Sequence, residues 1–150
     1  MNYLKTDSAY ILRIDRGEEI VKAIHDLCQK EQIGLGFLSG IGAVDYARLG
    51  LYSLEKRRYL VNEFKGEYEI TSLIGNITAQ EGAPYIHMHM TISDETGAVV
   101  GGHLSEARVA VTCEIVINLL KGTIEREMDP GIGINLMVFP AGGAELPSQS

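Results

Sequence analysis

Cysteine is scarce in this sequence, and a membrane span and a secretion signal are both missing. The two cysteines cannot be paired from sequence alone; Cys28 falls on the apolar side of a predicted helix and Cys113 in an apolar strand pattern, so we expect two reduced thiols in the core. No apolar run is long enough to cross a bilayer, and the chain does not start with basic and then apolar residues. We therefore expect a cytoplasmic protein without a membrane partner.

Basic residues are also fewer than acidic ones. Lysine and arginine number 13 against 20 aspartates and glutamates, which gives a net charge of −7. Duplex DNA is bound largely through neutralisation of its phosphates, so an acidic chain would need a local basic patch. The most basic run is 55–58, which we interpret as a solvated strand end or hairpin tip because Glu55 and Glu63 dilute its charge.

Several common catalytic and nucleotide-binding motifs are absent from the sequence. The glycine-rich segment 39–42 lacks the lysine and the following helix of a phosphate-binding P-loop, and its spacing does not fit a dinucleotide fingerprint. No catalytic serine or cysteine motif occurs. Chemistry in this chain therefore has to come from other side chains.

The pattern of apolar residues predicts an α+β domain built on a mainly antiparallel sheet with one main helix. We expect a single domain over residues 1–139 and a flexible C-terminal tail over 140–150. Residues 1–7 are interpreted as a polar lead. The helix is predicted over 18–32, after a capping-box pattern at 15–18, and strands are predicted over 9–14, 33–38, 44–52, 68–77, 109–120 and 134–139.

Residues 85–104 are predicted to form a β-hairpin, because apolar side chains alternate along its first arm and Asp94-Glu95-Thr96-Gly97 supplies a turn. One register keeps the apolar residues on one face: it sets Asp94 opposite Ala98, Ile92 opposite Val100, Met90 opposite Gly102, Met88 opposite Leu104 and His89 opposite His103. A two-residue loop would instead pair His103 with Met88 and mix polar with apolar side chains, so we prefer the first register.

Three of the four histidines then share one patch. His87 and His89 lie about 7 Å apart along the strand, and His103 lies about 5 Å across from His89. Three imidazoles with an open fourth position are typical of a reactive zinc site, although a polar strand face with incidental histidines is the simpler alternative. Gly101 and Gly102 indicate either a close approach of backbone or ligand, or a bulge. The fourth histidine, His25, is interpreted as a partly exposed helix residue.

Glu114 is the only other candidate for the site. The strand pattern around it is apolar on both faces, so we expect a buried carboxylate that needs a partner. Such a carboxylate can orient a metal-bound histidine, act as a base on bound water, or serve only as a structural hydrogen-bond acceptor. We rank the structural role first.

Three segments together resemble the plants-and-prokaryotes-conserved (PPC) domain over about residues 9–139. They are Phe37-Leu38-Ser39-Gly40-Ile41-Gly42-Ala43-Val44, Gly66-Glu67-Tyr68-Glu69-Ile70-Thr71-Ser72-Leu73-Ile74-Gly75, and the histidine hairpin that ends Gly97-Ala98-Val99-Val100-Gly101-Gly102-His103-Leu104. The resemblance implies an α+β fold that assembles as a homotrimer. In the plant proteins the domain follows AT-hook motifs that bind A·T-rich DNA. These 150 residues contain no Arg-Gly-Arg-Pro hook, and they are similar to stand-alone prokaryotic members whose three histidines resemble a zinc site.

Three functions remain open from the sequence. The first is a trimeric zinc protein with His87, His89 and His103 as ligands, Glu114 as a weak base candidate, and a small-molecule ligand or hydrolytic role that no motif identifies. The second is a DNA-associated regulator, which would require basic residues to gather on one face of the trimer (Arg48, Lys56, Arg57, Arg58 and Lys65). The third is a scaffold in which the metal only stiffens the trimer.

Overall fold

The computed structural model describes residues 1–139 and 143, so the predicted tail lies outside the described residues apart from Gly143. The division into a domain and a tail therefore stays a prediction. In the described part of the chain, no helix combines the length and the hydrophobicity needed to span a bilayer. The elements, in chain order, are β1 (Asn2–Lys5), β2 (Ala9–Asp15), α1 (Ile20–Lys30), β3 (Gly36–Ser53), β4 (Arg58–Gln80), β5 (Ala83–Ser93), β6 (Val99–Leu119), β7 (Arg126–Met128) and β8 (Asn135–Met137).

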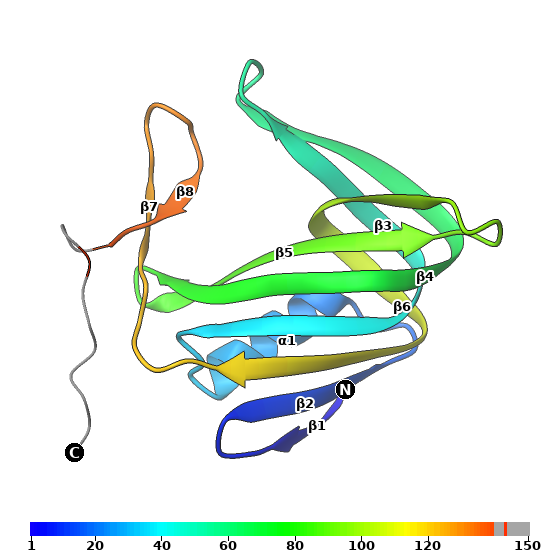
Figure 1. Ribbon diagram of the computed structural model, residues 1–150, viewed down its shortest axis with the longest axis horizontal. Coiled ribbons are helices and arrows are strands. Elements are labelled where there is room, and N and C mark those ends of the chain that lie inside the picture. Colours follow the sequence, from blue (N-terminus) through cyan, green and yellow to red (C-terminus); the bar gives the residue numbers. More distant parts are fainter. Residues whose placement is uncertain (140–142, 144–150) are drawn as a thin grey trace.

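Six strands form one antiparallel sheet in the order β1-β2-β6-β3-β4-β5, and α1 packs behind it (Figure 1). The first part of β6 also pairs with β5, which curls the sheet so that β3, β4, β5 and β6 close on one another. Strands β7 and β8 form a separate hairpin beside the end of β4. The predicted fold class, a mostly antiparallel sheet with one helix, is confirmed.

The helix covers one face of the sheet with the apolar stripe that the sequence predicts. Its buried residues are Ile20, Ile24, Leu27 and Cys28. The helix begins two residues later than expected, because the Glu19 carboxylate caps it by accepting hydrogen bonds from the backbone of Val21 (3.0 Å) and Lys22 (2.6 Å). Both cysteines are buried free thiols, as expected, and burial raises the pKa of each to about 12.

Four sequence-based boundaries are wrong, and long-range pairing explains them. The strands predicted over 33–38 and 44–52 are one strand over 36–53, because the glycines at 39–42 form a bulge within β3 and not a turn. A Cβ on Gly42 would lie 2.2 Å from the Thr112 carbonyl oxygen, so this bulge also brings β3 close to β6. Segment 58–80 is one strand, and 99–119 is another. The polar lead contains β1, which pairs with β2. The basic run 55–58 does lie at a hairpin tip, as expected.

Candidate metal centre

The β5–β6 hairpin has the register that the sequence predicts. The structure pairs His89 with His103, Met90 with Gly102 and Ile92 with Val100. The Asp94 backbone N–H donates to the Ala98 carbonyl (3.2 Å), and Gly97 takes a φ of +79° in the turn. Because side chains alternate along a strand, Met88 and Met90 enter the core while His87 and His89 point away from it.

Strand β6 changes partner at Gly102 and His103. One expected pair is wrong for this reason: Leu104 lies opposite Leu49 on β3 rather than Met88 on β5. A Cβ on Gly102 would lie 2.5 Å from the Gly50 carbonyl oxygen, so the two backbones can approach this closely only with glycine there. The predicted close backbone approach is therefore present, and it directs His103 over β5.

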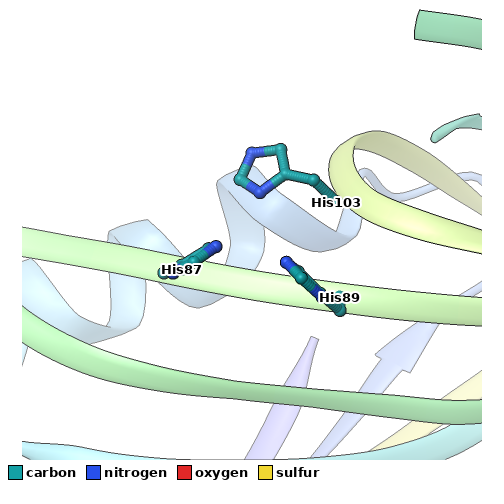
Figure 2. A group of neighbouring side chains, drawn as sticks. All are labelled: His87, His89 and His103. Atoms are coloured by element: carbon teal, nitrogen blue, oxygen red, sulfur yellow. The ribbon is translucent and has the colours of Figure 1, made fainter. Parts of the chain in front are cut away.

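The three imidazoles converge on one point (Figure 2). His87 and His89 rise from β5 and His103 reaches toward them from β6; their ring centroids are separated by 5.1, 5.1 and 5.8 Å. One nitrogen of each ring lies within 4.8 Å of the others. Tetrahedral zinc with Zn–N distances of about 2.0–2.1 Å needs these nitrogens about 3.4 Å apart, so small side-chain rotations complete a three-ligand site.

Burial holds two of the imidazoles in the uncharged form that binds metals. Burial is the main cause that lowers the pKa of His103 to about 4, and the nearby His87 and His89 lower it further. Burial is also the main cause of the lowered pKa of His87, and the charges of His89 and Arg126 contribute to it. His103 Nδ1 is buried, and within the described residues it has no hydrogen-bond partner. An unpartnered ring nitrogen in a group of three histidines fits the donor set of a divalent metal.

Aromatic and polar side chains surround the histidines. Tyr59, from the long β3–β4 hairpin, stacks on His103 with ring centroids 4.5 Å apart and an interplanar angle of 28°. Beside the two β5 histidines lies an open hollow of about 180 Å³, which is lined by Phe37, Ile74, Gly75, Asn76, His87 and His89. Arg126 from β7 donates to the Asn76 side chain at the edge of this hollow (2.9 Å).

The structure brings neither Glu114 nor the fourth histidine to this centre. Glu114 is exposed, not buried as expected; it lies on β6 between Arg13 of β2 and Ile41 of β3, eleven residues from His103. It therefore needs no buried partner, and its position does not support a role beside the histidines. The His25 side chain is 48% exposed on α1, in agreement with its interpretation as a helix surface residue.

Three residues at the centre were not predicted from the sequence. Asn76 was predicted only as part of the strand 68–77, and Tyr59 and Arg126 lie outside every predicted helix and strand. None of them has a local pattern that singles it out, because each reaches the histidines through pairings between strands far apart in the chain.

The comparison with known proteins agrees with this architecture. Residues 1–121 match the Plants and Prokaryotes Conserved (PCC) domain, also abbreviated PPC. The chain belongs to this family. A PPC protein from Pyrococcus horikoshii is 34% identical, with a TM-score of 0.79 over 91% of this chain and 94% of that chain. A metal-containing protein from Archaeoglobus fulgidus is 33% identical, with a TM-score of 0.81 over 92% of this chain and 99% of that chain.

Other PCC relatives carry different descriptions. A "putative DNA-binding protein" from Bacteroides thetaiotaomicron is 30% identical, with a TM-score of 0.88 over 91% of this chain and 96% of that chain. The bifunctional protein GlmU of a Synechococcus strain is 29% identical over 138 residues, which cover 89% of this chain and 21% of GlmU. This PCC chain thus spans about a fifth of the length of the curated relatives it matches.

The close approach at Gly102 gives a testable prediction. Gly102→Ala places a methyl group against the Gly50 carbonyl, so β3 and β6 must separate and His103 must move. We expect a loss of about 1–3 kcal/mol in the free energy of unfolding, measured by urea denaturation. The control is Gly34→Ala, whose Cβ would meet only the Thr123 hydroxyl at 3.9 Å. Equal stability of the two variants would contradict the role assigned to Gly102.

Proposed function

We propose that this PCC protein binds a divalent metal, most naturally zinc, through His87, His89 and His103. The observation that carries the proposal is the convergence of three ring nitrogens within 4.8 Å on two adjacent strands. Imidazole is a preferred zinc ligand, and a set of three protein ligands leaves a fourth position for water or a small molecule. The metal-containing relative from Archaeoglobus fulgidus supports the proposal.

The surroundings favour a reactive centre over a purely structural one. Structural zinc sites are usually closed by four protein ligands, whereas this centre offers three and borders an open hollow. A zinc ion held in this way acts as a Lewis acid and lowers the pKa of bound water. The protein's own contribution is to keep the imidazoles uncharged and to place the hollow beside them, so a small-molecule or hydrolytic role follows from the proposal.

Metal analysis of untagged protein tests the ligand set. We expect about one zinc per chain in the parent and none in a variant that combines His87→Ala, His89→Ala and His103→Ala, because no other group of three metal-ligating side chains occurs in the described residues. His25→Ala is the matched control, since this histidine lies exposed on α1. A parent that stays free of metal after zinc is offered and the excess removed would disprove the site.

Self-association through the open face of the sheet is the second part of the proposal. The face opposite α1 exposes apolar side chains on four adjacent strands: Ile11 is 48% exposed, Phe37 46%, Ile41 60%, Ile74 48% and Val116 37%. Apolar patches of this kind often mark protein–protein interfaces. The trimeric state itself comes from the family resemblance, and this face is the surface on which we place its subunit contacts.

A charged residue in this face should disrupt assembly. Ile41→Lys is expected to convert a species of three times the chain mass into monomer, measured by sedimentation velocity, because a lysine would have to be desolvated in the interface. Leu54→Lys is the control, since Leu54 is at least as exposed (69% against 60% for Ile41) but lies in the turn between β3 and β4, outside this face. A parent that sediments as a monomer would contradict the proposed assembly.

DNA binding is the alternative function that the description of the Bacteroides relative favours. The basic residues of the β3–β4 hairpin offer little free charge for it. Arg48 lies 3.5 Å from Glu106 and Lys65 lies 3.2 Å from Glu63, while Arg57 donates to the Pro130 carbonyl. Within the described residues, Lys56 and Arg58 are the two hairpin cations whose side chains make neither an ion pair nor a hydrogen bond.

A mobility-shift titration with A·T-rich duplex separates the two functions. With a net charge of −7 and two free hairpin cations, we expect no retarded band even at about 50 mM salt, where phosphate contacts are strongest. A band that weakens as salt is raised, and that Lys56→Gln combined with Arg58→Gln abolishes, would instead establish DNA binding by the hairpin.

A further inference from the structure

Arg126 is a buried cation without a carboxylate partner among the described residues. Its side chain is 7% exposed, and its three hydrogen bonds go to neutral acceptors: Nε donates to the Thr78 hydroxyl (2.8 Å), Nη1 to the Asn135 carbonyl (3.0 Å) and Nη2 to the Asn76 side-chain oxygen (2.9 Å). Across residues 1–139, no acidic side chain lies within ion-pair distance of it. Buried arginines are usually paired with an anion, so its charge lacks the usual compensation.

This guanidinium lies on the same side of the sheet as the proposed metal ligands. Asn76, which accepts its Nη2 hydrogen bond, is the cross-strand partner of His87 and lines the hollow beside His87 and His89. The Arg126 guanidinium carbon lies 4.8 Å from the centre of the Tyr85 ring, and Tyr85 is two residues from His87 on β5. The arginine therefore lies beside two of the residues around the hollow, Asn76 and, through Tyr85, His87.

Two features of Arg126 indicate a role besides linking β7 to β4 through hydrogen bonds. A guanidinium has five N–H donors and only three are used here, which leaves one N–H on each terminal nitrogen. A planar pair of terminal N–H groups is the donor arrangement that binds carboxylate or phosphate oxygens. In addition, the neutral acceptors around Arg126 could be satisfied by an uncharged donor, without the cost of burying a cation.

The charge balance of the whole centre points the same way. The three imidazoles bring no negative charge, so a divalent metal in the proposed site would add two positive charges beside that of Arg126. Glu114, the one carboxylate considered for this region, is exposed elsewhere on the sheet. A negatively charged ligand would compensate both the metal and the arginine.

We propose that Arg126 binds an oxyanion group, a carboxylate or a phosphate, of a small ligand whose other end takes the open metal position. This inference rests on the proposed metal site and names the class of ligand that it accepts. Asn76 holds the guanidinium in place at the edge of the hollow.

Calorimetric titration of the zinc-loaded protein with malonate, inorganic phosphate and acetate tests the inference. We expect one malonate or one phosphate per chain, and the tighter of the two identifies the oxyanion. Acetate, which cannot reach both the metal and the arginine, should bind at least tenfold more weakly than the preferred anion. An absence of binding by both malonate and phosphate would overturn the proposal.

Two variants separate the role of Arg126 from a general loss of folding. Arg126→Lys keeps the charge but removes the paired donors, and Asn76→Asp supplies the missing carboxylate in nearly the same shape. Each should weaken binding of the preferred anion at least tenfold while zinc content stays at the parental level. Asn76→Asp makes the test independent of any damage that the loss of the buried arginine does to β7. Arg13→Gln, at an arginine 59% exposed on β2, is the control and should bind like the parent.

The outcomes distinguish a failure of this inference from a failure of the proposed metal site on which it depends. Unchanged anion affinity in both variants, with zinc bound, would overturn the role of Arg126 and leave the metal site intact. If the parent protein binds no zinc, the metal site is disproved. If this zinc-free parent still binds the anion and both variants do not, Arg126 remains supported as an oxyanion site.

Discussion

The position of the third histidine depends on how closely two backbones approach each other. Strand β6 starts as the partner of β5 and becomes the partner of β3, and at the change Gly102 lies against Gly50 with no room for a side chain between them. Because β6 bends there, His103 projects over β5 toward His87 and His89. A straight strand would not bring His103 close to them. The curled sheet and the stacking of Tyr59 on His103 both follow from this bend.

The centre is therefore built mainly from rigid strands. His87 and His89 are fixed by alternation along β5, since Met88 and Met90 between and beside them are buried in the core. Burial also favours uncharged imidazoles, so the same packing that orients the rings prepares them as ligands. Binding of the proposed metal would need little rearrangement of the rings, which favours affinity because the side chains are already ordered in the folded protein.

The sequence was most informative where the determining interactions are local. The hairpin register and the pairing of His89 with His103 follow from alternation and one turn, both contained within twenty residues. Glu114 was misplaced because Val116, two residues along the strand, made their shared face appear buried, whereas Val116 is exposed on the open face of the sheet. Arg126 and Asn76 are fifty residues apart in the sequence, and a contact between residues so far apart cannot be predicted from a local sequence pattern.

The arginine and the histidines belong to separate stretches of the chain. The histidines lie within residues 1–121, which match the PCC domain, whereas β7 follows that region and reaches Asn76 through a few side-chain hydrogen bonds. The C-terminal hairpin is also attached to the tip of the long β3–β4 hairpin, where the Tyr52 hydroxyl donates to the Ile132 carbonyl. In the centre we propose, substitutions after residue 121 would change which ligand is selected without altering the strands that hold the three imidazoles, so the two parts of the centre can evolve independently.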